Sequence, residues 1–273
     1  VPQHPAFNLD HYCHEGPMAR TVADVALFTN IIAGQHPHDI TSLPKPADLP
    51  LSGSSIKGLK IAVCHHLGDY PVDPDMLANL DASADALRQA GATVEVIELP
   101  WTREQIMHAA KIHYGAIFAP SVGRAVAEYR DIMTDYAIHF AEEGAEVMQN
   151  ATFLEGISIE GEIYAPLGEL LLDYDAMICP TLAVPALQAG VSYVTERIPV
   201  AGTEITQWEH LMTVPFNICS RLPVLAVPSG FAQTGVPTGI QIVGRAFDDL
   251  TTFEIAYALE RERPWAQTRP SFA

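Results

Sequence analysis

The residues Val-Leu-Ala-Val-Pro-Ser-Gly at 224–230, followed by Gly-Val-Pro-Thr-Gly-Ile-Gln-Ile-Val-Gly-Arg at 235–245, predict two neighbouring strands. Their apolar runs, 224–227 and 240–243, are rich in Val and Ile and end at Pro or Gly, which is typical of strands in a buried sheet. Gly235 lies between the runs, where a residue that tolerates a positive φ lets the chain reverse. We therefore expect an antiparallel core hairpin.

A βαβ unit is predicted earlier in the chain. Residues 60–64 and 93–99 have strand character, and 75–90 has Leu and Ala at the spacing of an amphipathic helix that ends at Gly91. Such a crossover joins parallel strands and is right-handed. Because the hairpin is antiparallel and this unit is parallel, we predict an α/β fold with a mixed β-sheet flanked by helices.

The remaining segments complete a single domain over residues 1–273. A helix is expected at 20–33, where Thr21 and Asp24 form a capping-box-like start. Residues 37–57 are rich in Pro and Ser and predict an extended surface crossing. Residues 101–172 predict several helices and no strand, whereas 175–180 returns to strand character and 249–263 closes the chain as a helix.

Composition limits the possible partners. Hydrophobic residues make up 48% of the chain and charged residues 18%, which favours a folded domain over disorder. The formal charge of −18, from 33 acidic and 15 basic residues, repels phosphate backbones and anionic lipids. No segment reaches the length of a membrane span. We expect neither nucleic acid nor a membrane as a partner.

The cysteines predict reduced, buried thiols in a cytoplasmic protein, because they form no CxxC pair. They are Cys13, Cys64, Cys179 and Cys219. His65 and His66 follow a strand directly, but adjacent imidazoles point in different directions and no third ligand stands at a suitable spacing. The other histidines considered are scattered at positions 11, 14, 36 and 38. No metal site is expected.

Four blocks, taken in order, resemble the amidase signature family of hydrolases. They are Gly-Pro-Met-Ala-Arg-Thr-Val-Ala-Asp at 16–24, Lys-Gly-Leu-Lys-Ile-Ala-Val at 57–63, Tyr-Asp-Ala-Met-Ile-Cys-Pro-Thr at 174–181, and the hairpin ending at Arg245. The resemblance implies the amidase signature fold, hydrolysis of the C–N bond of a small carboxamide, and no metal or organic cofactor. One loop departs from the family pattern, because 217–223 is one residue longer and lacks a Gly.

The same resemblance implies catalytic residues that this sequence does not contain. Family members use a Ser nucleophile, a second Ser and a buried Lys, presented by a Gly-Gly-Ser-Ser-Gly-Gly-like loop and a downstream Gly-Ser. Neither motif occurs here. Ser54 and Ser55 lack the flanking glycines of an oxyanion loop, and Ser229 lies in no G-x-S-x-G elbow. We therefore expect no catalytic residue in this chain.

The expected function is accordingly that of the carboxy-terminal part of an amidase, inactive by itself. Val1-Pro2 falls where the strand after the nucleophile helix ends in the family, so the chain is expected to begin just downstream of the last catalytic residue. Its partners would be a small amide substrate and the amino-terminal half of the same enzyme, with a homo-oligomer also possible. Two alternatives stay open: a non-catalytic subunit that pairs with a separately encoded amino-terminal half, and an amidotransferase A-type subunit.

Five residues are candidates for the substrate pocket. By resemblance, His113, Tyr114 and Ile117 lie in the helical region that covers the acyl pocket, although an ordinary half-buried aromatic and histidine pair would look the same. Thr181 and Asn217 each stand beside a strand end near a Pro, where side chains face the mouth of the sheet. Local stabilisation of the backbone is the alternative for both residues.

Overall fold

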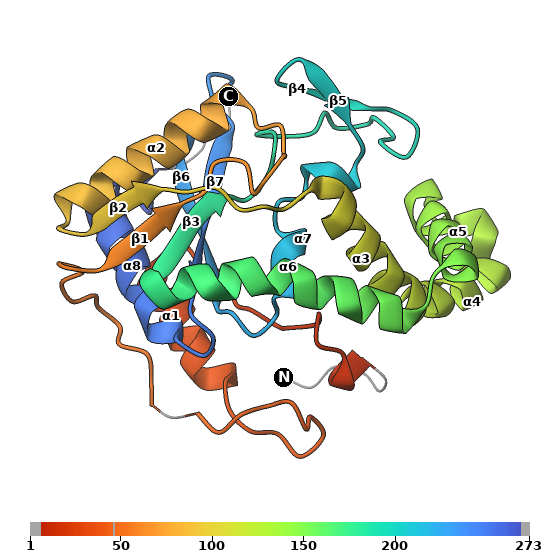
Figure 1. The fold of residues 1–273 in the computed structure, drawn as a ribbon, viewed down its shortest axis with the longest axis horizontal. Coiled ribbons are helices and arrows are strands. Elements are labelled where there is room, and N and C mark those ends of the chain that lie inside the picture. The colour runs from red at the N-terminus through yellow and green to blue at the C-terminus, as the bar shows by residue number, and fades with distance from the viewer. Residues whose placement is uncertain (1–6, 46, 269–273) are drawn as a thin grey trace.

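The computed structural model describes residues 7–45 and 47–268, in which five strands form one mixed sheet in the order β2-β1-β3-β7-β6 (Figure 1). Strand β1 pairs in parallel with β2 and β3, whereas β7 is antiparallel to β3 and to β6. The predicted βαβ unit, hairpin and mixed α/β sheet are confirmed. The strands are β1 (Lys60–Val63), β2 (Thr93–Val96), β3 (Ala176–Pro180), β6 (Val224–Phe231) and β7 (Pro237–Gly244).

Each face of this sheet buries its own apolar cluster, because successive side chains of a strand point to opposite faces. Ile61 and Ile178 belong to one cluster, and their neighbours Ala62 and Met177 belong to the other. The first face is covered by α1 (Val22–Ile32), α2 (Pro74–Gln89) and α8 (Asp249–Glu262). The second face is covered by α3 (Arg103–Ile117), α6 (Phe153–Asp173) and α7 (Val214–Ile218).

Further elements lie away from the sheet. Helices α4 (Ala119–Tyr129) and α5 (Asp135–Asn150) pack on each other and on α3, at the side of the molecule remote from the sheet in Figure 1. Strands β4 (Ile198–Val200) and β5 (Thr203–Ile205) form a separate two-stranded ribbon, which was not predicted because strands of three residues carry too short an alternation. Short 3-10 helices are η1 (Phe7–Leu9), η2 (Arg130–Ile132) and η3 (Trp208–His210). No described helix combines the length and apolarity needed to cross a bilayer.

The predicted start of the first helix is confirmed. Thr21 Oγ1 accepts a hydrogen bond from the backbone N–H of Asp24 at 3.1 Å, which satisfies a donor in the first turn of α1. Arg245, at the end of the hairpin, donates through Nε to the carbonyls of Leu171 and Tyr174 and forms an ion pair with Asp175. This side chain therefore holds the end of α6 against the sheet.

The hairpin differs from the sequence prediction in one respect. Of its two strands, β7 is central and largely buried, but β6 is an edge strand that pairs only with β7 among the described strands. Val224 and Ala226 are exposed, and only Val227 of the run 224–227 is buried. Continuous apolar runs occur on edges that meet another surface as well as in the core, so the pattern alone could not separate the two cases.

Two glycines of α6 provide a matched test of how closely α3 and α6 pack. A Cβ at Gly156 would lie 2.7 Å from Cγ2 of Ile112 on α3, whereas a Cβ at Gly161 would meet nothing within 4 Å. We expect Gly156→Ala to destabilise the chain by about 1–3 kcal/mol, because Ile112 is stiff and buried. Gly161→Ala should stabilise it by about 0.5–1 kcal/mol, since an exposed helical Gly costs that much relative to Ala.

Urea unfolding of both variants measures these changes in free energy. Equal stabilisation by the two substitutions would contradict the close approach of α3 and α6 at Gly156.

Candidate functional site

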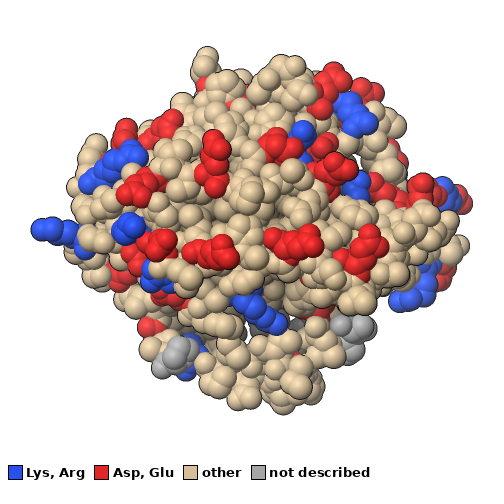
Figure 2. All heavy atoms as spheres, in the orientation of Figure 1, with Lys and Arg blue, Asp and Glu red and all other residues tan. Residues whose placement is uncertain are grey.

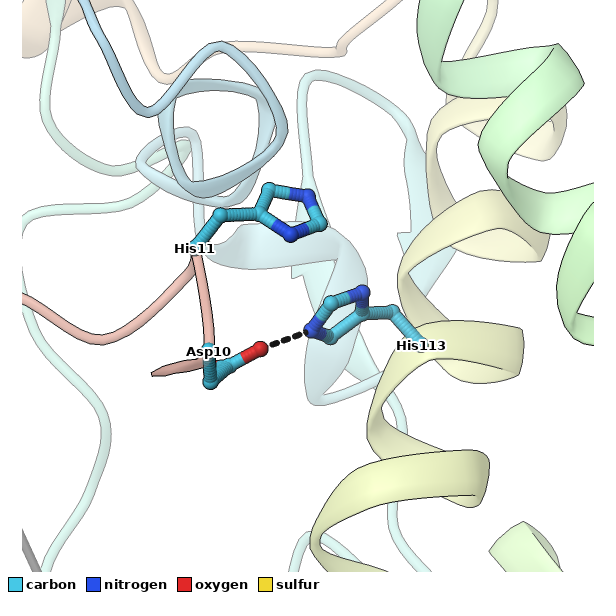
Figure 3. A group of neighbouring side chains, drawn as sticks. All are labelled: Asp10, His11 and His113. Carbon is cyan, nitrogen blue, oxygen red and sulfur yellow. Dashed lines mark hydrogen bonds and ion pairs between the residues drawn. The ribbon is translucent and has the colours of Figure 1, made fainter. Parts of the chain in front are cut away.

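Polar side chains from three separate parts of the chain meet in the core on the α3 and α6 side of the sheet. Asp10 comes from the segment that follows η1, His113 from α3 and Glu160 from α6, and all three are buried. His113 Nε2 lies 2.6 Å from Asp10 Oδ1 (Figure 3). Its Nδ1 lies 3.4 Å from Glu160 Oε1. The imidazole of His113 therefore stands between two carboxylates.

Two neighbours of Asp10 complete this buried polar cluster, which we define as Asp10, His11, Tyr12, His113 and Glu160. The Tyr12 hydroxyl donates to Glu160 Oε1 at 2.7 Å, and the Tyr12 ring stacks on the His113 ring with centroids 3.5 Å apart. His11 Nε2 lies 3.2 Å from Glu160 Oε2. Both oxygens of Glu160 thus face polar partners, as a buried carboxylate requires.

Helix α6 places Glu160 in the core through its periodicity. The buried residues of α6 are Gly156, Glu160, Ile163, Leu167 and Leu171, at intervals of three or four along one face. Glu160 is the charged member of an otherwise small or apolar stripe. The stripe turns its carboxylate toward α3, where His113 lies on the buried face of that helix.

The surroundings fix the charge of this cluster. Burial by itself would raise the pKa of Glu160, but contacts with His11, His113 and Tyr12 outweigh it and lower that pKa to about 2. Burial and the adjacent Glu160 carboxylate raise the pKa of Tyr12, and burial and Glu160 raise the pKa of Cys219 to about 12. At neutral pH, Glu160 is therefore an anion and Tyr12 a neutral donor.

Two buried atoms in the cluster have no hydrogen-bond partner among the described residues. They are Asp10 Oδ2 and His113 Nδ1, whose contact with Glu160 lacks hydrogen-bond geometry. The side chains that carry them are only 2% and 1% exposed. Unsatisfied groups of this kind are uncommon in the core of a folded protein and point to a role beyond packing.

Three of the five predicted pocket residues lie at this cluster. His113 is a member, and the Tyr114 ring contacts the Tyr12 ring edge-on at 5.5 Å. Asn217 donates through Nδ2 to the Tyr12 carbonyl at 3.3 Å. Tyr114 also contacts Trp208, which stacks on Phe140. The rings of Tyr114, Phe140 and Trp208 form an aromatic wall beside the cluster.

The location expected for Asn217 needs correction. We predicted a loop that leads into a strand, but the residue lies on α7. A five-residue helix that begins with Pro near its first turn carries too little periodicity to be recognised in the sequence.

The other two predicted pocket residues stand apart from the polar network. Ile117 is half-buried at the end of α3. Thr181 follows β3 and donates through Oγ1 to the Gly239 carbonyl on β7 at 3.0 Å. A role in a substrate pocket stays a prediction for all five residues.

An open cavity adjoins the cluster. It has a volume of about 670 Å³ and lies between the segment after η1, the end of α1, the crossing at 39–45 and 47–49, and the start of α8. Asp10 belongs to both the cavity wall and the cluster, and so connects them. Exposed apolar side chains on its wall are Leu43, Phe247 and Leu250.

Sequence reasoning missed Asp10, Tyr12 and Glu160, and it wrongly treated His11 as scattered. Glu160 could have been found, because it interrupts an apolar stripe of α6 at a core position. Asp10 and Tyr12 had no comparable signal, since they lie in a segment without regular structure beyond η1 and meet His113 across about a hundred residues of chain.

The hydrogen bond from Tyr12 to Glu160 should contribute measurably to stability. Tyr12→Phe keeps the stacked ring but removes a donor from a buried carboxylate, which we expect to cost about 1–3 kcal/mol. Tyr174→Phe is the matched control, because its hydroxyl donates to Glu95 at an exposed site and its loss should cost less than about 0.5 kcal/mol. Urea unfolding compares the two; equal losses would contradict the buried role of Tyr12.

Comparison with known proteins shows what this architecture is similar to. The chain is 29% identical to an acylamidase of Rhodococcus erythropolis, over 96% of this chain and 54% of that protein. It is 28% identical to the A subunit of the glutamyl-tRNA(Gln) amidotransferase of Thermosynechococcus vestitus, over 93% of this chain and 56% of that protein. The chain thus spans about half the length of the curated relatives it matches.

Solved structures agree in fold. A bacterial aryl acylamidase of the amidase signature family superimposes with a TM-score of 0.79 and 24% identity, over 92% of this chain and 53% of that one. The A subunit of the glutamyl-tRNA(Gln) amidotransferase of Thermotoga maritima superimposes with a TM-score of 0.68 and 25% identity, over 91% of this chain and 52% of that one. The family model described as Amidase matches residues 9–253, which is most of the sequence. The chain belongs to the Amidase family.

Proposed function

We propose that this chain is the carboxy-terminal part of an amidase that hydrolyses the C–N bond of a small carboxamide. The observation that carries the proposal is the match of the Amidase family model to residues 9–253. In this proposal, the chain supplies half of the sheet and part of the substrate pocket. The nucleophilic Ser, the second Ser and the Lys come from polypeptide other than these 273 residues.

The surroundings of two serines support the proposal that the catalytic groups lie on another polypeptide. Ser54 is exposed, and its backbone N–H binds the Glu254 carboxylate at 2.5 Å. Ser229 is buried, and its hydroxyl pairs with Thr238 at 2.8 Å rather than with a base. A nucleophilic Ser needs a base within hydrogen-bond reach and donors for the oxyanion, and neither environment supplies these.

Two surfaces support assembly with a further polypeptide. The outer edge of β6 has no strand partner among the described residues, and such an edge favours pairing with another strand. The cavity next to Asp10 carries large exposed apolar side chains, with Phe247 64% and Leu43 55% exposed. Apolar surface around a hollow of this kind is typical of an interface or a ligand site.

The aromatic wall formed by Tyr114, Phe140 and Trp208 is the proposed place for the acyl group. The hollow that it lines with Lys111 and Gly144 holds only about 10 Å³, so the rings would have to move apart to admit an acyl group. Aromatic faces of this kind favour an apolar or aromatic acyl portion.

Relatives named as the A subunit of a glutamyl-tRNA(Gln) amidotransferase favour a second candidate, an amidotransferase A-type subunit. The face in Figure 2 shows acidic side chains spread widely and basic ones lying singly or in small groups. With a formal charge of −18, this surface disfavours direct RNA contact, so a tRNA would have to be held by other proteins of the complex. We prefer an amidase that acts on small molecules.

Ammonia release from a panel of carboxamides tests the proposal. We expect none from the purified chain, and none after Ser54→Ala with Ser55→Ala. We expect turnover when a polypeptide that carries the family Lys and Ser pair, from the adjoining reading frame, is co-expressed with the chain. Replacing the nucleophilic Ser of that polypeptide with Ala is the control and should abolish turnover.

Two results would overturn the proposal. Turnover by the chain alone that survives both serine substitutions would show that the catalytic groups lie within it. A stable complex without turnover would favour the non-catalytic subunit instead.

A further inference from the structure

We propose that Asp10, His11 and His113 bind a divalent transition-metal ion, and that this ion is zinc. One ligand atom from each residue lies within 4.8 Å of the other two, and the three side chains lie together in Figure 3. Two imidazoles and a carboxylate are a ligand set that suits Zn²⁺. This inference is independent of the proposed amidase activity.

Glu160 selects the ring nitrogens that are available to the ion. His11 Nε2 lies 3.2 Å from one Glu160 oxygen, and His113 Nδ1 lies 3.4 Å from the other. If these nitrogens carry the protons, the lone pairs lie on His11 Nδ1 and His113 Nε2, and Nε2 is the atom that faces Asp10. Carboxylates that accept the second N–H of a ligating histidine are the usual support of such sites.

The charge and the unpaired oxygen of the cluster favour a cation. Two carboxylates, Asp10 and Glu160, are buried together, and Asp10 Oδ2 has no hydrogen-bond partner among the described residues. Without an ion, the Nε2–H of His113 bonds to Asp10 Oδ1 at 2.6 Å. Binding of the ion would replace this hydrogen bond, and the single ring proton would move from Nε2 to Nδ1, where it faces Glu160 Oε1.

The site lies next to an open cavity. Asp10 lines the cavity of about 670 Å³, but its side chain is only 2% exposed, so side chains would have to move to admit an ion and a water ligand. Zinc contacts of about 2.0–2.2 Å place tetrahedral ligand atoms about 3.3–3.6 Å from one another. Asp10 Oδ1 and His113 Nε2, which are 2.6 Å apart, would therefore have to separate to admit the ion. The His11 side chain is 31% exposed, so it has more room to move than the other two.

Zinc binding to the metal-free chain tests the proposal directly. Titration with ZnCl₂ in competition with a chromophoric chelator should give one ion per chain. Glu160→Gln should lower the association constant by about 10–100-fold, because it loses the group that orients both rings. His11→Ala, which removes a ligand, should lower it by more than about 100-fold.

His65→Ala is the matched control. His65 also pairs with a carboxylate, Asp81 Oδ1 at 2.8 Å, but it lies outside the cluster, so its loss should leave zinc affinity unchanged. Cys13→Ser tests whether the free thiol that lines the same cavity as Asp10 binds zinc instead. Zinc should also raise the melting temperature of the wild type and of His65→Ala, but not that of His11→Ala.

Three outcomes would overturn the proposal. A wild-type chain that binds no stoichiometric zinc contradicts it whatever the variants do. Affinity that is lost in Cys13→Ser but kept in His11→Ala would place the ion on the thiol. Equal losses in His65→Ala and His11→Ala, with both variants folded by circular dichroism, would indicate nonspecific binding.

Discussion

Strand β3 pairs with β1 in parallel on one side and with β7 antiparallel on the other, and both layers of helices are arranged around this double pairing. All five of its residues are buried, so its two edges and two faces are covered by other parts of the chain. Because β3 lies between β1 and β7, it joins strands that begin at residue 60 and end at residue 244 into one sheet. The mixed character of the sheet follows from this one strand.

Helix α6 runs directly into β3, and this connection sets the position of the buried polar cluster. Arg245 binds carbonyls at the end of α6 and pairs with Asp175, which precedes β3. This fixes the angle at which the helix meets the sheet. The stripe that contains Gly156 packs closely on Ile112 of α3, and Glu160 follows one turn later opposite His113. The absence of a side chain at Gly156 thus brings the carboxylate and the imidazole together.

The cluster itself balances two opposing effects. Burial of the Asp10 and Glu160 carboxylates is costly, and the hydrogen bond from Tyr12 and contacts with two imidazoles offset that cost for Glu160. Asp10 is compensated less completely, because Oδ2 has no partner among the described residues. It is also the member of the cluster that lines the open cavity.

Local sequence patterns were sufficient to predict the α/β class, the βαβ unit, the hairpin and the start of α1, because these depend on periodicity, caps and turns. The short β4–β5 ribbon and the helix at Asn217 are too brief to carry such patterns. Only the packed molecule places β6 at an edge and brings Asp10, Tyr12, His113 and Glu160 together. Whether a charged side chain is buried depends on which helix or segment packs against it, and that contact spans sequence distances over which no periodicity extends.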